Sequence, residues 1–546
     1  MIDFFDFSNL HFYIGILIAV INSVLLCFEG YKFMQIIQLS GYHLKGYFDW
    51  LKDTRAKYIV RLLMLTLLST ACFLVTNVIF NAYLDYLAYL GFVFYAVFSI
   101  IFIRLIYKAP KKTPLQMTHR MSRGMALLFF VNLIISFGLI VLSSMFIDIF
   151  RFGAVALTPI MLPLIVPFVH WLMQPIEKGI NKSFVRKAKK RLETMPGLIK
   201  IGITGSYGKT SVKNFLHTLL AEKYSVCSTP LNFNTPMGIT KTVLQLLAPL
   251  DQVLIVEMGA RQIGDIKELC EIVDPSFGIV TAVGEQHIAT FQSIENVRRT
   301  KAELPEYLKS KNGFCVFNLD SENTKKIYDN VNCDKMGISV LSKESPIYAT
   351  NIVTTTDGTS FILHIENFEE ISVNTKLFGQ HNINNLLLCV AMAVKLGLTR
   401  DELIRGLGRI MPVEHRLQLI KAENDITIID DAYNSSIEGS EKALEVLALW
   451  KDKRKIVITP GLVELGTMER LANYNLGEKI AKVANITIIM NKVHYLPIKQ
   501  GLIDKGFDET KIYNTDNMDS TKKLLEELLQ PHDIVLWEND LPDNYT

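Results

Sequence analysis

The sequence is short of net charge, of paired cysteines and of repetition. Its 57 lysines and arginines nearly balance 54 aspartates and glutamates, so the formal charge of +3 gives no support to a role in nucleic-acid binding. Seven cysteines are scattered over 546 residues without a CxxC pair, which argues against a disulfide framework or a zinc site. We find no internal repeat and no low-complexity segment. What the chain does have is an excess of apolar residues, with a mean hydropathy of +0.25, and most of it lies before residue 175.

Five long apolar runs account for that excess. Each approaches the roughly 20 residues that a helix needs to cross the hydrocarbon core of a bilayer. We therefore predict a transmembrane domain over residues 1–175, because five buried helices in succession would need a very large soluble core. The first run is not a cleaved signal peptide by its pattern, since Asp3 and Asp6 precede it and no small-residue cleavage site follows. The runs are 12–28, 62–80, 86–106, 125–147 and 154–172.

Lysine and arginine residues set the predicted orientation of these runs. They are concentrated after the first, third and fifth runs, whereas the loops near Asp85 and Asp148 are poor in them. We therefore expect a multi-pass membrane protein with its N-terminus outside and everything after residue 175 in the cytoplasm. No run carries a charged residue near its middle, so no ion or proton pathway is predicted. The basic segment 176–195 is interpreted as a cytoplasmic linker, either a plain topology signal or also a contact for anionic lipid.

The remainder of the chain alternates short β-branched runs with helical patterns, which is typical of an α/β fold with parallel strands. Two sets of such runs predict two domains in succession, over 196–412 and 413–546. The join is placed near residues 411–416, where a proline follows a helical stretch. The predicted strands are 198–203, 252–257, 278–282 and 313–318 in the first domain, and 426–429, 455–459, 486–490 and 533–537 in the second. The predicted fold class is an α-helical transmembrane domain, then an α/β domain with a phosphate-binding loop, then a Rossmann-like domain.

The strongest single motif is the run GITGSYGKTS at residues 202–211, which leaves a predicted strand and opens a predicted helix. A turn of this kind directs backbone N–H groups and the N-terminus of a helix at phosphate. Lys209 adds a positive charge there, and Thr210 offers a hydroxyl to Mg²⁺. The spacing departs from the standard Walker A motif. The residues assigned to ATP binding in this loop are Thr204, Gly205, Ser206, Gly208, Lys209, Thr210 and Ser211.

Seven further motifs follow this loop along the chain. They are NFNTPMG at 232–238, VEMGA at 256–260, GEQH at 284–287, TKAE at 300–303, GQHNINN at 379–385, HR at 415–416 and DDAYN at 430–434. The eight motifs, in this order, resemble those of the Mur ligases, the ATP-dependent ligases of bacterial cell-wall synthesis. The resemblance covers roughly residues 196–540, and the NFNTPMG and DDAYN motifs look most like the MurF type. It implies a bacterial ligase of peptidoglycan-precursor synthesis, and the apolar runs are expected to place it at the cytoplasmic membrane.

The chemistry that these residues suit is the activation of a carboxylate by ATP. Amide formation in water is uphill, so the carboxylate is first converted into an acyl phosphate, and cations must meet the charge on the transferred phosphoryl group. Lys209 and Mg²⁺ do so on the ATP side, with Thr210 and Glu257 as oxygen ligands of the metal. Glu257 ends a buried apolar strand, an unfavourable place for a carboxylate unless it holds a cation. The alternative is an ordinary strand-end glutamate.

The resemblance implies roles for the other site residues. In the family, the lysine at the position of Lys301 is carbamylated by CO₂ and lies near a second Mg²⁺, which the histidine at the position of His287 also binds. From the residues alone, the alternatives are an exposed helix lysine and a hydrogen-bonded loop histidine. Lys209, His287, Lys301 and Arg416 form the expected catalytic set. Asn382 and Asn385 are expected to face adenine, and the alternative for Asn385 is a helix cap. Asp431 is expected to bind ribose, and Arg416 is expected to reach the γ-phosphate as the C-terminal domain closes. Asn232 and Asn234 are expected to contact substrate.

Two departures from the MurF pattern concern the acceptor substrate rather than ATP. No separate UDP-binding domain fits between the last apolar run and the ATPase core, and ENDLP at 538–542 stands where the family often has a Lys-Gly-Ser turn. We predict a ligase that adds D-Ala-D-Ala, or a similar amino compound, to a muramyl-peptide carboxylate. The alternatives are the same ligase acting on a polyprenyl-linked precursor held at the membrane, a polyglutamate-type ligase, and a non-catalytic membrane scaffold.

Overall fold

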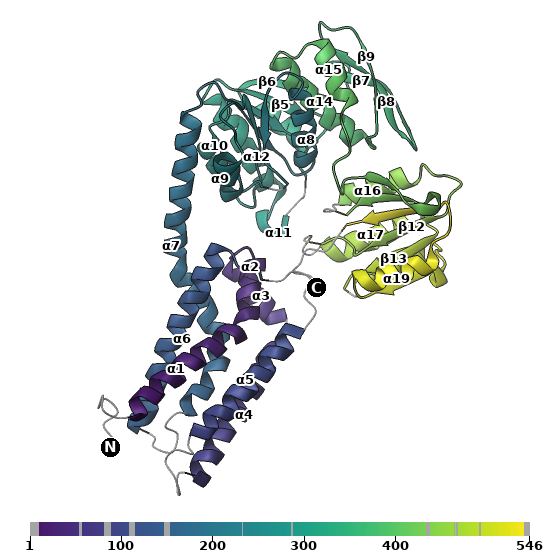
Figure 1. The fold of residues 1–546 in the computed structure, drawn as a ribbon. Coiled ribbons are helices and arrows are strands. Elements are labelled where there is room, and N and C mark those ends of the chain that lie inside the picture. The colour runs from purple at the N-terminus through teal and green to yellow at the C-terminus, as the bar shows by residue number, and fades with distance from the viewer. Residues whose placement is uncertain are drawn as a thin grey trace. The chain divides into compact units, whose positions relative to one another are not determined.

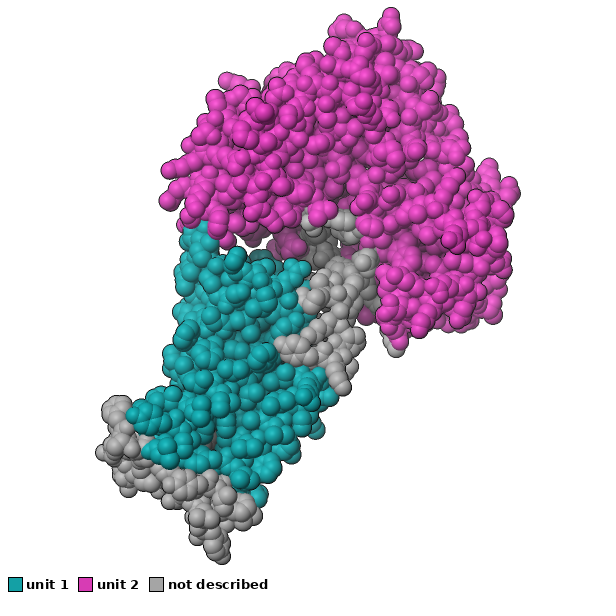
Figure 2. Space-filling model, in the orientation of Figure 1, with its two compact units in different colours: residues 1–180, 542–546 teal, residues 181–541 magenta. Residues whose placement is uncertain are grey.

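The computed structural model describes residues 10–53, 57–80, 89–108, 115–146, 153–231, 233–284, 288–432, 437–463, 465, 468–490 and 493–539. The chain divides into two compact units, which are coloured separately in Figure 2. Unit 1 comprises residues 1–180 and 542–546, and unit 2 comprises residues 181–541. The division separates an apolar helical part from an α/β part.

The described secondary structure of unit 1 consists of helices, joined by turns and short segments (Figure 1). Four stretches are long and apolar enough to cross a membrane, by length and composition: Phe12–Glu29, Ile59–Thr76, His119–Ser143 and Ala154–Glu193. The predicted third run forms a shorter apolar stretch, Leu90–Leu105. The helices are α1 (Leu10–Glu29), α2 (Tyr31–Leu39), α3 (Leu44–Asp53), α4 (Lys57–Phe80), α5 (Leu90–Lys108), α6 (His119–Phe146), η3 (Gly153–Leu157) and α7 (Thr158–Glu193).

Unit 1 exposes apolar side chains and buries polar ones. Ile134, for example, is 72% exposed, whereas Asn22, Tyr95, Ser136 and Thr158 are fully buried. The Asn22 amide donates to Ser136 Oγ at 2.8 Å and to Thr158 Oγ1 at 3.1 Å, and it accepts from the Tyr95 hydroxyl at 2.6 Å. A hydrogen-bonded polar interior inside an apolar exterior is typical of helices that face lipid.

Helix α7 continues from unit 1 into unit 2 without a break, although it contains three prolines. The predicted linker 176–195 is therefore helical over most of its length. Its end packs on unit 2, where Ala188 and Leu192 join a buried apolar cluster. Arg191 also donates to the carbonyl of Leu244 at 3.0 Å. The last turns of α7 thus contribute to the folded core of unit 2.

The first α/β domain of unit 2 contains a six-stranded parallel sheet in the order β2-β3-β1-β4-β5-β6. The four strands predicted here all form, as β1, β3, β4 and β5. Strands β1, β3 and β4 are neighbours, so their carboxyl ends meet at one edge of the sheet, where ligands of such folds bind. The strands are β1 (Ile199–Thr204), β2 (Val226–Ser228), β3 (Val253–Glu257), β4 (Phe277–Val280), β5 (Phe314–Asn318) and β6 (Asp334–Ile338).

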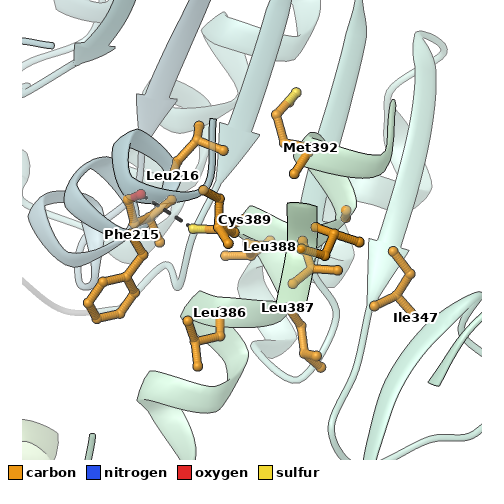
Figure 3. Packing of buried hydrophobic residues seen from close by; sticks show 14 of the residues in the cluster. Phe215, Leu216, Ile347, Leu386, Leu387, Leu388, Cys389 and Met392 are labelled. Atoms are coloured by element: carbon orange, nitrogen blue, oxygen red, sulfur yellow. Dashed lines mark hydrogen bonds between the residues drawn. The ribbon is translucent and has the colours of Figure 1, made fainter. Parts of the chain in front are cut away.

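Helices cover both faces of this sheet. They are α8 (Lys209–Leu220), α9 (Pro236–Gln245), α10 (Asp265–Val273), α11 (Ile288–Phe291), α12 (Ile294–Lys309), α13 (Glu322–Asn330), α14 (Gln380–Lys395) and α15 (Arg400–Gly408). Every residue of α14 from Asn382 to Ala393 is buried. It packs against α8, and Cys389 Sγ donates to the carbonyl of Val212 at 3.3 Å within this apolar cluster (Figure 3). Burial on both faces explains why the strands are continuous apolar runs.

A small antiparallel sheet of three strands lies between β6 and α14 in the sequence, and the sequence analysis missed it. Its strands are β7 (Ile347–Thr355), β8 (Gly358–Ile365) and β9 (Ile371–Thr375), in the order β7-β8-β9. Buried and more exposed residues alternate along them, because only one face packs on the core. This alternation is less conspicuous than the continuous apolar runs of the parallel strands.

The second α/β domain has its own six-stranded sheet, in the order β10-β11-β15-β12-β13-β14. All pairs are parallel except β10 with β11, and the four predicted strands form. The strands are β10 (Gln418–Lys421), β11 (Thr427–Asp431), β12 (Lys455–Thr459), β13 (Ile486–Met490), β14 (Ile512–Thr515) and β15 (Ile534–Glu538). The helices are η4 (Glu423–Asp425), α16 (Ile437–Leu447), α17 (Glu469–Ile480), α18 (Tyr495–Asp504), η6 (Glu509–Lys511) and α19 (Met518–Leu528).

Candidate active site

The glycine-rich loop forms the turn between β1 and α8. Gly205 and Gly208 have φ angles of 149° and 81°, a region that favours glycine. A Cβ atom at Gly205 would lie 1.9 Å from Thr281 Oγ1. The N–H of Ser206 donates to the carbonyl of Ala282 at 2.7 Å, which ties the loop to the segment after β4. Only glycine fits at position 205 in this arrangement.

Lys209 is the first residue of α8, and its ammonium turns back over the loop. Its Nζ donates to the carbonyls of Gly205 and Ser206, each at 2.9 Å. Burial lowers the pKa of Lys209 to about 8, and Arg416 acts in the same direction while Glu257 opposes it. A poorly solvated ammonium held by neutral carbonyls would gain from a phosphate anion, because a charge-assisted hydrogen bond is stronger than a neutral one.

Thr210 and Glu257 meet from α8 and from the carboxyl end of β3. Thr210 Oγ1 donates to Glu257 Oε2 at 3.0 Å, and Asn234 Nδ2 donates to the other carboxylate oxygen at 3.2 Å. The Glu257 side chain is only 2% exposed. A hydroxyl and a carboxylate at this spacing are the hard oxygen ligands that Mg²⁺ takes, so these residues fit the predicted metal. Asn234, which was predicted to contact substrate, thus contacts Glu257, the predicted metal ligand.

Lys213 is part of this site, and the sequence analysis missed it. Its Nζ lies 3.2 Å from Glu257 Oε2 and donates to the carbonyl of Leu231 at 2.5 Å. Its side chain is 2% exposed. Lys213 follows Lys209 by one helical turn, so the two lysines share a face of α8, and this spacing was the available signal. The ion pair offsets the buried charge of Glu257 and ties it to the segment that precedes Asn234.

Lys301 lies on α12 and is 3% exposed, so its interpretation as an exposed helix lysine is wrong. Burial and the nearby Lys209 lower its pKa to about 7, against the opposing effect of Asp265 and Glu303. Near neutral pH, a lysine with this pKa presents a large fraction of neutral amine, which is the nucleophilic form.

Asn382 and Asn385 lie inside α14, next to the phosphate loop. Asn382 Nδ2 donates to the carbonyl of Phe378 at 2.8 Å, and Asn385 Nδ2 donates to Asn382 Oδ1 at 3.5 Å. A Cβ at Gly208 would lie 2.6 Å from Asn385 Oδ1. The residue that caps α14 is Gly379, so the alternative of Asn385 as a helix cap is wrong.

The join between the two α/β domains brings Arg416 close to Asp431. Burial raises the pKa of Asp431 to about 6, against the opposing effect of Arg416. Asp431 Oδ1 accepts from the N–H of Leu417 at 3.2 Å, and His415 Nδ1 lies 2.7 Å from Asp430 Oδ2. His415 and Leu417 have φ angles of 59° and 49°, which are unfavourable for non-glycine residues. The backbone is therefore strained on both sides of Arg416.

Most of the described site residues thus gather around one loop, and two predicted residues are not among those that the structure describes. His287 and Asn232 lie outside the described residues, so their roles stay predictions. Thr204 and Ser211 are buried, and Thr204 Oγ1 donates to the carbonyl of Met258 at 3.3 Å. These two residues support the loop from within, while Lys209 and Thr210 present their polar groups at its surface.

Comparison with known proteins shows what this part of the chain resembles. Residues 203–393 match the model of the Mur ligase middle domain. The UDP-N-acetylmuramoyl-tripeptide–D-alanyl-D-alanine ligase of Buchnera aphidicola subsp. Baizongia pistaciae is 31% identical over 280 residues, covering 51% of this chain and 60% of that protein. The protein of the same name from Mycobacterium tuberculosis H37Rv is 29% identical over 362 residues, covering 62% and 70%. This chain therefore spans only part of the length of each relative.

Solved structures agree in fold. A MurF crystal structure from Acinetobacter baumannii has a TM-score of 0.60 at 22% identity, covering 67% of this chain and 78% of that one. The MurF ligase of Thermotoga maritima in complex with ADP has a TM-score of 0.58 at 24% identity, covering 66% and 80%. Residues 203–393 therefore match a Mur ligase middle domain, and the α/β part of the chain is similar to MurF ligases in sequence and in fold.

Proposed function

We propose that this protein is an ATP- and Mg²⁺-dependent ligase that joins an amine to a carboxylate and releases ADP and phosphate. The observation that carries the proposal is the gathering of Lys209, the Thr210–Glu257 pair and buried Lys301 around one loop. An oxygen of the carboxylate attacks the γ-phosphorus, and the bond from that phosphorus to the bridging oxygen of ADP breaks. The amine then attacks the acyl phosphate, loses a proton and displaces inorganic phosphate.

The residues around the loop divide this work. Lys209 exchanges two backbone carbonyls for phosphate oxygens and so places its charge where negative charge moves during transfer. Thr210 and Glu257 would hold Mg²⁺, which neutralises charge on the phosphates when it is bound. Arg416 adds a planar donor group from the domain join, close enough to act on the Lys209 charge. The strained backbone on both sides of Arg416 supports this role, because it indicates that the fold fixes the position of the arginine.

Carbamylation of Lys301 is part of the proposal. The neutral amine adds to the carbon of CO₂ and releases one proton, which converts a buried cation into a carbamate anion. The pKa of about 7 supports this step, since the unprotonated amine is available at cellular pH. The carbamate would be a further oxygen ligand beside the phosphate loop, with His287 as its predicted partner.

The substrates proposed are a muramyl tripeptide as acceptor and D-Ala-D-Ala as amine. They are the substrates in the printed names of the relatives that this chain resembles. The MurF likeness favours them over a polyglutamate-type substrate. The intact nucleotide loop, with its buried lysines and paired carboxylate, favours an enzyme over a non-catalytic scaffold.

We further propose that unit 1 spans the bacterial cytoplasmic membrane with the ligase domains in the cytoplasm. Four long apolar helices and an apolar exterior around a polar interior support this placement. Positive charges in the segments after the first, third and fifth runs support the orientation.

A lipid-linked acceptor is the second candidate substrate, and the connection between the units favours it. Helix α7 ends at Glu193 and β1 begins at Ile199, so the ATPase core follows the last apolar helix almost directly. The acceptor would then be held by its lipid in the membrane rather than by a domain that grips UDP.

Products formed by the purified full-length protein test the function. The protein in nanodiscs would receive ATP, Mg²⁺, D-Ala-D-Ala and either UDP-linked or polyprenyl-linked muramyl tripeptide, with ADP release and product mass as readouts. We expect one ADP per D-Ala-D-Ala added. Faster turnover of the polyprenyl-linked substrate would support the second candidate, and faster turnover of the UDP-linked substrate would exclude it.

Lys209→Ala is the control for chemistry at this site. It should lower turnover by far more than tenfold, because it removes the ammonium that contacts the phosphates. A tenfold loss alone would correspond to about 1.4 kcal/mol of activation free energy. ADP release by the variant within tenfold of wild type would exclude the assigned ATP site.

A further inference from the structure

One end of the helical unit contains a pocket that is lined by the positively charged side chain of Arg120. The pocket has a volume of about 20 Å³, room for one oxygen-sized group. Helix α2, the turn after it, the start of α6 and the middle of α7 contribute its walls. They include Met34, Ile37, Arg120, Gly124, His170 and Met173. A charged residue in an otherwise apolar pocket indicates a polar ligand group with an apolar attachment.

Aromatic rings hold the Arg120 guanidinium in place. Its central carbon lies 3.6 Å from the centre of the Tyr42 ring. The His170 ring stacks with the same tyrosine at 6.1 Å and 21°, and His170 Nε2 lies 3.0 Å from the Tyr42 carbonyl oxygen. A guanidinium whose central carbon is held over the face of a ring can still direct N–H groups from its edge at an anion.

The pocket has more positive groups than negative ones. The nearby carboxylate, Glu177, is paired with Arg123 at 2.7 Å and is almost fully buried. Among the residues that the structure describes, no carboxylate forms an ion pair with Arg120. His43 and Arg123 lie near enough to act electrostatically on His170 and Arg120 respectively. Glu177 also acts electrostatically on Arg120, so this one carboxylate serves two guanidinium groups, and the excess of positive charge favours an anionic ligand.

The pocket lies at the depth of the lipid head groups if unit 1 spans the membrane. Arg120 precedes the fourth apolar run, and His170 lies near the end of the fifth, so both stand at the predicted cytoplasmic boundary. Trp171 beside it is 58% exposed and stacks on Phe168, with ring centres 6.0 Å apart. Exposed tryptophan is typical of the membrane–water interface.

We propose that Arg120, supported by Tyr42 and His170, binds the phosphate of a membrane lipid at the cytoplasmic surface. This inference rests on the proposed placement of unit 1 in the membrane. One phosphate oxygen enters the pocket and accepts from the guanidinium, with Met34, Ile37 and Met173 as the apolar walls around it, while the lipid chain stays outside the pocket in the bilayer. The site would hold a polyprenyl-phosphate carrier, the class of lipid on which a lipid-linked acceptor is built.

Lipid binding by the full-length protein tests the site. The protein would be placed in phosphatidylcholine nanodiscs containing a few per cent of a polyprenyl phosphate, and lipid retained on release would be counted by native mass spectrometry. We expect Arg120→Gln to weaken retention at least tenfold, and polyprenol without phosphate to bind as weakly. Lys178→Gln is the matched control, because Lys178 is an exposed cation on the same helix as His170, and it should change retention less than twofold.

Two further arms separate the remaining outcomes. Gly124→Leu fills the pocket without changing charge, since only the mobile Met34 Cε lies within 3.0 Å of an added Cβ, and it should also weaken retention. Inorganic phosphate should not compete at millimolar concentration if the ligand is a lipid. Equal retention by wild type and Arg120→Gln, or equal competition by free phosphate, would overturn the proposal. Because no ATP is present, failure here leaves the proposed ligase activity untouched.

Discussion

Lys301 illustrates how burial changes the chemistry of a side chain that the sequence leaves ambiguous. Its neighbours Arg298 and Arg299 suggest a solvated helix face, yet the side chain is buried near Lys209 and its pKa falls to about 7. We expect Lys301→Ala to be nearly inactive, because the carbamate ligand cannot form. Added formate or acetate should restore part of the ADP release by supplying a carboxylate. Full activity of the wild type in a CO₂-depleted assay would contradict the carbamate.

The same residue predicts how stability depends on pH. The folded pKa of Lys301 lies near 7 and the unfolded value near 10.5, so between these values the unfolded chain binds more protons and stability rises with pH. Below pH 7, the folded protein carries the full free-energy cost of a buried charge, on the order of 5 kcal/mol. In CO₂-free buffer, Lys301→Met should therefore raise the melting temperature at pH 6 and have little effect near pH 10.5. A stabilisation that is equal at both pH values would contradict the shifted pKa.

Lys213 predicts a link between metal binding and stability. Removing one partner of a buried ion pair leaves the other charge unpaired, at about 3–5 kcal/mol. Lys213→Met should lower the melting temperature without metal, and 10 mM Mg²⁺ should stabilise this variant more than wild type, because the metal replaces the lost cation at Glu257. Lys213→Arg is the control and should respond like wild type. An equal response to Mg²⁺ in all three proteins would exclude a shared site.

At the scale of elements, the contact of α14 with the phosphate loop sets the shape of the nucleotide site. Gly208 has a φ of 81°, and a Cβ there would lie 2.6 Å from Asn385 Oδ1. Gly208→Ala should therefore push α14 from the loop and lower the affinity for ADP at least tenfold. Gly506→Ala is the matched control, since its φ of 79° is close to that of Gly208 but no atom lies within 4 Å of the added Cβ. Isothermal titration with ADP should find the control unchanged, and an equal loss in both variants would point to backbone strain alone.

Helix α7 shows why an element boundary and a domain boundary need not coincide. The basic segment 176–195 separates two regions of different composition, and the sequence marks it as a linker. Its last turns nevertheless pack into unit 2 through Ala188, Arg191 and Leu192. A soluble fragment should begin at residue 181 rather than after 190, because a later start removes core residues.

At the scale of the whole molecule, the arrangement of charges and apolar helices predicts topology. A cysteine introduced at Glu268, which is exposed in unit 2, should react with a membrane-impermeant maleimide only after cells are lysed. A cysteine introduced at Ser8 should react in intact cells, since the N-terminus is predicted to lie outside. Native cysteines that react would first be replaced by serine. Labelling of the Glu268 position in intact cells would contradict the predicted orientation, in which unit 2 lies in the cytoplasm.

The sequence by itself determined the class of each part of this protein. Apolar runs predicted the helical unit, and four continuous apolar strands of each six-stranded sheet were found because burial on both faces leaves an uninterrupted pattern, whereas β2, β6, β10 and β14 were not predicted. The half-buried strands β7–β9 were missed because their pattern is weaker. Motif order placed Lys209, Thr210 and Glu257 near one another, since a strand-to-helix loop and a neighbouring strand end share one edge of a sheet.

Only the tertiary structure decided the environment of the side chains. Whether Lys301 is solvated, whether Lys213 faces Glu257 and whether Asn385 touches Gly208 depend on packing between residues far apart in the chain. Arg120 is one of many basic residues in its segment, and its position on the Tyr42 ring follows from the meeting of several helices. Local sequence specifies residue types and periodicity, whereas charge, burial and pKa are set by contacts that form only when the chain folds.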